Sequence, residues 1–385
     1  MRELVIIIPD LYLAPREAGQ TQTAAGVALP GLQQALRFGR KSALQGDWRS
    51  WLARWLRRED LASVAPARIV SGAPPASAAV VCDRNTTAWL ATPLHLIASL
   101  TSLHLDPRSI LQLSPDESAA LAEDFNRTFA DSPFRLEAVE SGALLMRAHG
   151  VVDAATTEPA RALAGELEAS LPRGPDAGVL KRLGAELEMW LHSHPINDTR
   201  ARRGEFPVNT LWLWGGSAAT GRQELSTARS PSVPSARAPS VSVPPTSAPD
   251  IDSAPSDLFF GSDPYLTGLL RAHGAAAQPL PESLPDLGAY PAIQRAAFVA
   301  AVTPALHANP RWTLFEALAD LDRRFLAPAL AGLRHGTAAA VILIANDIQL
   351  RVERRDSLKF WRRSPRSALD ELRSNVPPPM RGNLN

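Results

Sequence analysis

Three unbroken aliphatic runs, far apart in the chain, most constrain what this sequence can fold into. They are residues 4–8 (LVIII), 78–82 (AAVVC) and 338–345 (AAAVILIA). Strands that are apolar on both faces are typical of parallel sheets, because helices cover both faces of such a sheet. The sequence therefore predicts an α/β fold with a doubly wound, mostly parallel sheet.

An aspartate follows the end of each aliphatic run: Asp10, Asp83 and Asp347. The carboxyl ends of parallel strands lie along one edge of a sheet, where open α/β folds bind their ligands. Carboxylates gathered there can hold a divalent cation, so Asp10 and Asp347 are candidate metal ligands. The ordinary alternative is that each aspartate is a turn residue.

The segment between the second and third aliphatic runs includes a stretch with a different pattern of predicted elements. Ser114 and the residues after it predict a capped helix to about residue 129, followed by a hairpin at 134–139 and 143–146. We therefore expect a core domain at residues 1–100 and 176–385, with a small α+β, lid-like domain inserted at 101–175. The segment 221–256 is rich in serine and proline and is expected to be a disordered insertion within the core.

The remaining periodicities predict further elements. We expect helices from Pro30, after Asp47, and at 87–100, 179–191, 263–273, 292–307 and 313–333, and strands at 103–105, 110–113, 210–214 and 258–260. The alternation of Ile348, Leu350 and Val352 fits an antiparallel edge strand.

The densest group of hydrogen-bonding side chains lies between residues 192 and 209, directly before the strand at 210–214. It includes His194, Asn197, Arg200, Arg203 and Asn209. Arginine forks and asparagine amides suit phosphate and carboxylate groups, so we expect a loop that binds an anionic ligand through these residues. The alternative is a turn in which the asparagines satisfy backbone groups.

Composition excludes several classes of protein. The formal net charge of the 385 residues is +1, which gives no reason to expect a nucleic-acid partner. Cys82 is the only cysteine, so an intrachain disulfide is excluded. The short apolar run at 4–8 is no signal peptide and no run is long enough to span a membrane, so we expect a cytoplasmic protein. Nucleotide-binding glycine motifs and the zinc-protease motif are absent.

Two basic aromatic stretches carry alternative interpretations. Trp48, Trp51 and Trp55 share one helical face with arginines mostly off it, which is typical of a core-facing helix and less so of one that lies on a membrane. The cations around Phe360 and Trp361 are better explained as a solvated edge than as a nucleic-acid contact.

One motif resembles a known family. The pattern His194-Pro195-Ile196-Asn197-x-x-Arg200-x-x-x-Gly204-x-x-Pro207-Val208-Asn209, followed by a strand and Gly215-Gly216, resembles a segment of the archaeal-type cofactor-independent phosphoglycerate mutases. These belong to the alkaline phosphatase superfamily, and the layout is also similar to RpfE-type regulatory proteins.

The resemblance implies an alkaline phosphatase-like core that binds a phosphorylated small metabolite. It also implies metal-dependent phosphoryl transfer, with manganese or magnesium held by a strand-one aspartate, here Asp10, and by further Asp and His residues. No Asp-His dipeptide occurs in the chain, and the family's serine nucleophile has no identified counterpart. The alternative is therefore a catalytically degenerate relative that binds a metabolite or a protein partner in a regulatory role.

Overall fold

The computed structural model describes residues 2–13, 27–72, 86–98, 103–163, 167–216, 257–284, 294–358 and 367–373. The strand predicted at 78–82, Asp83, the Ser/Pro-rich segment 221–256 and most of the C-terminal basic stretch lie outside these residues. Within the described residues, no helix has the length and apolar character needed to cross a membrane.

The first of the two main sheets has six strands and is mostly parallel. Its strands, in spatial order, are β2 (Arg40–Ala43), β12 (Ile348–Glu353), β11 (Ala340–Ala345), β1 (Glu3–Ile8), β10 (Arg295–Val299) and β9 (Leu258–Phe260). Strands β11, β1, β10 and β9 run parallel to one another, whereas β12 and β2 are antiparallel to their neighbours. The predicted α/β class is confirmed.

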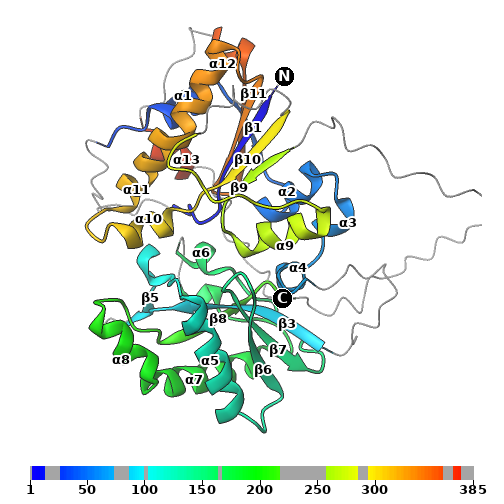
Figure 1. The fold of residues 1–385 in the computed structure, drawn as a ribbon, viewed down its shortest axis with the longest axis vertical. Coiled ribbons are helices and arrows are strands. Elements are labelled where there is room, and N and C mark those ends of the chain that lie inside the picture. Colours follow the sequence, from blue (N-terminus) through cyan, green and yellow to red (C-terminus); the bar gives the residue numbers. More distant parts are fainter. Residues whose placement is uncertain are drawn as a thin grey trace, which may run out of the picture.

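Helices cover both faces of this sheet (Figure 1). One face carries α1 (Pro30–Phe38), α10 (Val302–Ala308), α11 (Leu314–Leu321), α12 (Ala327–His335) and α13 (Ala368–Arg373). The other carries α2 (Trp48–Trp55), α3 (Glu59–Ala62), α4 (Pro66–Val70) and α9 (Pro264–His273). The alternation of β1 explains this, since Leu4, Ile6 and Ile8 belong to one core and Val5 and Ile7 to the other.

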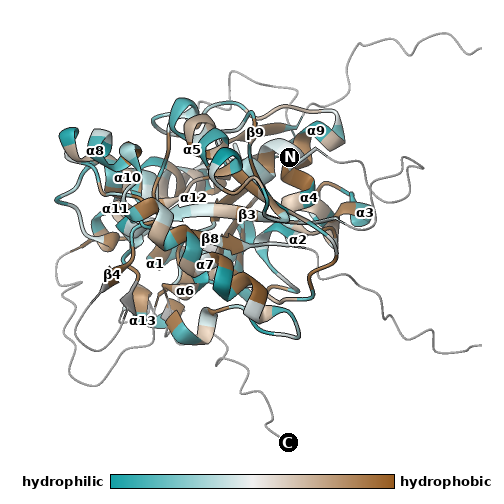
Figure 2. Ribbon diagram, turned by 90° about the horizontal axis from the view of Figure 1, so that it is seen from below, coloured by the Kyte–Doolittle hydropathy of each residue, from teal (hydrophilic) through white to brown (hydrophobic). Residues whose placement is uncertain are grey.

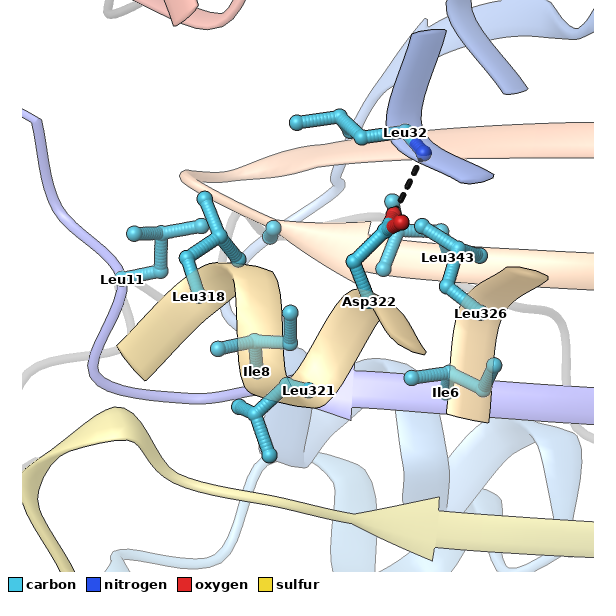
Figure 3. A pocket seen from close by; sticks show the side chains of 10 residues that line it. Ile6, Ile8, Leu11, Leu32, Leu318, Leu321, Asp322, Leu326 and Leu343 are labelled. Carbon is cyan, nitrogen blue, oxygen red and sulfur yellow. Dashed lines mark hydrogen bonds between the residues drawn. The ribbon is translucent and has the colours of Figure 1, made fainter. Parts of the chain in front are cut away.

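A single turn of π-helix, η4 (Asp322–Leu326), joins α11 to α12. It places the buried Asp322 against the start of α1, where its carboxylate accepts hydrogen bonds from the backbone N–H groups of Gly31 (2.9 Å) and Leu32 (2.6 Å). These are donors that a helix leaves unsatisfied at its N-terminus. Figure 3 shows the bond from Leu32. The small cavity beside Asp322 has a volume of only about 10 Å³ and is otherwise apolar, so Asp322 has a structural role.

The second sheet has four antiparallel strands. In order they are β6 (Phe134–Ala138), β7 (Leu144–His149), β3 (Thr86–Leu94) and β8 (Thr210–Trp214). Helices α5 (Pro115–Thr128) and α7 (Ala177–His192) pack on one face around a third core, and both carry hydrophilic residues as well as apolar ones (Figure 2). The remaining elements are short: β4 (Ile97–Ala98), β5 (Leu103–His104), η1 (Pro107–Ser109), α6 (Pro159–Ala162), η2 (Leu167–Ser170), α8 (Pro195–Arg202) and η5 (Arg354–Leu358).

Several local predictions are wrong. The helix expected at 87–100 is strand β3, in which Trp89 and Ala91 face one core while Ala88 and Leu90 face another. This period of two is masked in the sequence because both faces are apolar. The helix expected at 292–307 begins with strand β10 and becomes helical only at α10. Residues 110–113 form only an isolated bridge at Ile110, and β12 is not an edge strand because β2 lies outside it.

The two sheets divide the chain differently from the expected domain boundaries. Strands β3 and β8, expected in the core domain, pair with each other in the second sheet. The elements between them, from 86 to 216, lie together below the six-stranded sheet in Figure 1. Residues 86–98 and 176–216 therefore accompany the described part of the expected insertion and not the six-stranded sheet.

Candidate functional site

A cleft of about 690 Å³ lies between the two sheets. One wall comes from the segments that follow β1, β9 and β10, including Asp10, Asp263 and Thr303. The other wall comes from β3, the turn between β6 and β7, and Trp214 of β8. The cleft thus lies at the carboxyl ends of parallel strands, and its volume is within the range of small-molecule sites.

Asp10 lies where the sequence predicts, at the end of β1. Its carboxylate oxygens accept one hydrogen bond each from the backbone N–H groups of Val302 (Oδ1, 2.8 Å) and Thr303 (Oδ2, 2.8 Å) at the start of α10. Burial raises the pKa of the Asp10 carboxyl, and the hydrogen bonds from Thr303 and Val302 act against that rise. Asp10 therefore joins strand β1 to helix α10.

Asp263 is the cap of α9 and also faces the cleft. Its Oδ1 accepts hydrogen bonds from the backbone N–H groups of Tyr265 (2.8 Å) and Leu266 (3.1 Å). Burial raises the pKa of Asp263, and the charge of Arg49 is the strongest opposing influence. The cap follows the sequence pattern Asp-Pro, in which proline suits the first helical turn.

Arg49, on α2, is buried beneath the cleft. Its guanidinium donates to both carboxylate oxygens of Glu158, at 3.0 Å and 2.7 Å, and lies 4.6 Å from the ring centroids of Trp48 and Trp214. Burial acts to lower the pKa of Arg49, but the charge and hydrogen bonds of Glu158, together with the charges of Asp263 and Asp47, outweigh burial and the pKa is raised. The pair links the two halves of the molecule through a permanently charged arginine.

Asp347 has structural partners as well. Asn346 and Asp347 are the two residues of the turn between β11 and β12, with φ of 52° and 62°. The Asp347 carboxylate receives a bidentate fork from Arg161 (2.6 and 2.7 Å) and a hydrogen bond from the hydroxyl of Tyr12 (3.1 Å). Glu158 directly precedes α6 and Arg161 lies within it. This short helix is therefore tied at two points to the half of the molecule with the six-stranded sheet: to Arg49 of α2 and to the turn between β11 and β12.

The residues that the structure describes do not fit a two-metal centre. Among the described residues, no three His, Cys, Asp or Glu side chains lie close enough together to hold a metal ion. Asp10 accepts two backbone hydrogen bonds, and both Asp347 oxygens are occupied by Arg161. Phosphoryl transfer between two cations needs a larger carboxylate and histidine set than this one.

The predicted anion-binding loop is partly helical, because α8 occupies Pro195–Arg202, so the prediction of a loop is wrong there. His194 caps α8: its Nδ1 accepts a hydrogen bond from Ile196 N (3.2 Å), and its Nε2 lies 3.2 Å from Asp124 Oδ2. Asn197 donates from its amide to the carbonyls of Leu191 (2.8 Å) and Val208 (2.9 Å) and accepts from Val208 N (2.8 Å).

The other three predicted ligand residues also have protein partners. Arg200 is buried and donates to the Phe206 carbonyl (2.7 Å) and to Glu117 (3.2 and 3.3 Å), and Arg203 pairs with the same Glu117. The Asn209 amide bridges the backbone N–H and C=O of Leu96, at 2.8 Å each. None of the five lines the cleft, which separates them from Asp10 and Asp263. As ligand contacts they stay a prediction.

Little in the sequence pointed to the residues that do line the cleft. In the sequence, Arg49 looks like the other arginines of α2, which were expected to be solvated. Only its position next to Trp48 distinguishes it from them. Glu158 lies before a four-residue helix that has no periodicity to read. Asp263 was recognisable as a helix cap, but its place in a cleft depends on the long-range pairing of β9 with β10.

Comparisons with known proteins give only distant matches. No protein-family model and no curated protein matches the chain. The cofactor-independent phosphoglycerate mutase from Thermoplasma acidophilum DSM 1728 is 12% identical over 96% of this chain and 94% of its own, with a TM-score of 0.34. The PH0037 protein from Pyrococcus horikoshii is 11% identical over 91% and 87%, with a TM-score of 0.38. Values this low assign no residue, substrate or activity to the chain.

Proposed function

We propose that this protein is a non-catalytic small-molecule-binding protein whose ligand lies in the cleft between the two sheets. The observation that carries the proposal is the cleft of about 690 Å³ at the carboxyl ends of β1, β9 and β10, lined by apolar walls and a few convergent polar groups. Sites of this composition are typical of ligand pockets in α/β proteins.

The proposal favours the regulatory alternative over metal-dependent phosphoryl transfer. Its support is that Asp10 and Asp347, the two aspartates that such chemistry would use, are engaged by backbone N–H groups and by Arg161. We retain within the proposal a doubly wound, alkaline phosphatase-like core. Parallel strands with helices on both faces support it.

Blocking the cleft tests the proposal. Ala305 lies on α10, half-buried in the cleft wall, so Ala305→Trp should fill part of the space without entering the core. In ligand-observed NMR with a library of small organic fragments, we expect fragments that bind the wild-type protein to bind Ala305→Trp at least ~10-fold more weakly. Ala331→Trp, on α12 and outside the cleft, is the matched control and should bind as the wild type does.

Two results would contradict the proposal. One is a fragment set that Ala305→Trp does not affect, since ligands would then bind elsewhere. The other is turnover of 3-phosphoglycerate in the presence of manganese that Asp10→Asn abolishes, since this would establish metal-dependent catalysis at the end of β1.

A further inference from the structure

The side chains that line the cleft include more negatively charged groups than positively charged ones. Three carboxylates, those of Asp10, Glu158 and Asp263, line it together with two guanidinium groups, those of Arg49 and Arg324. Which of these charges are free to meet a ligand depends on the partners that each has within the protein.

Both guanidinium groups are already paired. Arg49 gives its two terminal nitrogens to Glu158. Arg324 donates from Nη1 to Asp320 (3.0 Å), from Nη2 to the Pro281 carbonyl (3.0 Å) and from Nε to a further backbone carbonyl. Neither arginine therefore offers an uncompensated positive charge, and Glu158 is compensated by Arg49.

The carboxylates of Asp10 and Asp263 form no ion pair with a described residue. Backbone N–H groups donate to both carboxylates, the Thr303 side chain also acts on Asp10, and the charge of Arg49 acts on Asp263 from beyond ion-pair distance. In Asp263 both of these bonds go to Oδ1, which leaves Oδ2 free of hydrogen bonds from the described part of the chain. Carboxylates removed from water are unfavourable unless a positive charge or further donors meet them.

Two other buried polar atoms in the cleft wall lack a partner. Thr303 is 5% exposed and Arg49 is 4% exposed. Arg49 Nε has no hydrogen-bond partner among the described residues, and the Thr303 hydroxyl lies near enough to Asp10 to lower the pKa of that carboxyl but forms no hydrogen bond of good geometry. Unsatisfied buried polar atoms are rare in folded proteins and mark places where a ligand or ordered water supplies the missing bond. The backbone N–H of Thr303 itself donates to Asp10, so the Thr303 hydroxyl and the Asp10 carboxylate lie on the same wall.

We propose that the ligand of this cleft is an organic cation: a molecule whose ammonium group meets Asp263 and Asp10 and whose apolar body packs against Trp214 and the apolar wall of β3. The inference rests on the proposed binding function and names its ligand class. A primary ammonium group supplies three donors and one positive charge, which matches the free Asp263 oxygen and the unpaired Thr303 hydroxyl.

Other ligand classes fit these residues less well. A phosphorylated acid would place its negative charge beside two carboxylates, with both arginines of the cleft already occupied. A bare metal ion prefers six or more oxygen ligands or a compact set of three to four side chains, and the described residues hold no such set.

Three compounds with one ring system and different charges test the inference. Tryptamine is cationic, tryptophol is neutral and indole-3-acetate is anionic, so calorimetric titration of each into the full-length protein isolates the effect of charge. We expect tryptamine to bind at least ~10-fold more tightly than tryptophol and indole-3-acetate to bind most weakly. We expect Asp263→Asn to remove most of the preference for tryptamine, because asparagine keeps the helix cap while the charge is lost.

Asp60→Asn removes the same charge from α3, outside the cleft, and should leave the preference unchanged. Circular dichroism of Asp263→Asn verifies that the variant folds, and Ala305→Trp should abolish tryptamine binding if binding occurs in the cleft. Equal binding of the three compounds, preference for indole-3-acetate, no binding of tryptamine, or a preference that Asp263→Asn leaves intact would each overturn the inference. The proposed function fails separately, when no fragment of the library responds to Ala305→Trp.

Discussion

At the scale of single residues, the buried pair of Arg49 and Glu158 should dominate the energetics of the site. Their side chains are 5% and 11% exposed, so each charge depends on the other for compensation. We expect Glu158→Leu to lower the free energy of unfolding by about 3 kcal/mol, because the buried Arg49 guanidinium loses its bidentate partner and keeps only the weaker influence of Asp263 and of Asp47, at 3.5 Å, as counter-charges. Urea denaturation measures this loss.

The double variant Arg49→Met/Glu158→Leu distinguishes the contribution of the charge pair to stability from the contribution of side-chain packing. Removing both charges leaves no uncompensated ion, so we expect it to be more stable than Glu158→Leu by at least ~1 kcal/mol. If the double variant is the less stable of the two, the rings of Trp48 and Trp214 against the guanidinium contribute more than the charge pair does.

At the scale of elements, helix α8 should respond to acid through its cap. Burial lowers the pKa of His194 from its usual 6.5, and the charge of Asp124 acts against that effect. Below about pH 6.5 the unfolded chain therefore binds a proton that the folded His194 resists, so stability contributed by this residue is present above that pH and is lost as the pH falls below it. We expect the free energy of unfolding to fall more steeply from pH 7 to pH 5 in the wild type than in His194→Asn, which keeps an acceptor for Ile196 N.

If the free energy of unfolding falls equally steeply with pH in the wild type and in His194→Asn, the prediction is wrong, because His194 then does not carry the acid sensitivity. The comparison is made by urea denaturation at each pH. Asp124, the nearest carboxylate, titrates below this window because its pKa is lowered by its hydrogen bonds with Trp190 and Arg127, against the effect of burial.

Some helices and strands of this fold could be predicted from the sequence alone and others could not. Strong local signals sufficed for strands β1 and β11 and for α5, whose expected cap Ser114 forms a capping box with Glu117. Strand β3 was mistaken for a helix because both of its faces are buried, which removes the alternation that identifies strands. The candidate site was harder still. Asp10 could be placed at a strand end, but its role was decided by α10, nearly 300 residues away in the chain, and no local pattern encodes that contact.

At the scale of the whole molecule, the two sheets are held together around the cleft by a few polar links. The segment of α6 supplies two of them, from Glu158 to Arg49 and from Arg161 to Asp347. Others join Arg108 to the Trp312 carbonyl and His307 Nε2 to the Ile110 carbonyl (2.8 Å). Because these contacts surround the cleft, loosening them should affect access to it before it affects either core.

Asp347→Asn tests this arrangement. It keeps a residue that tolerates the left-handed turn conformation but removes the charge that Arg161 contacts. A partly exposed bidentate pair contributes about 1 kcal/mol, so we expect backbone amides of residues 155–163 to exchange with deuterium about fivefold faster, while β1 and β11 keep wild-type protection. Glu137→Gln, which breaks an ion pair with Arg147 inside the second sheet, is the control and should leave residues 155–163 unchanged. Faster exchange in β11 itself would mean that Asp347 supports the hairpin of β11 and β12 and not the junction between the sheets.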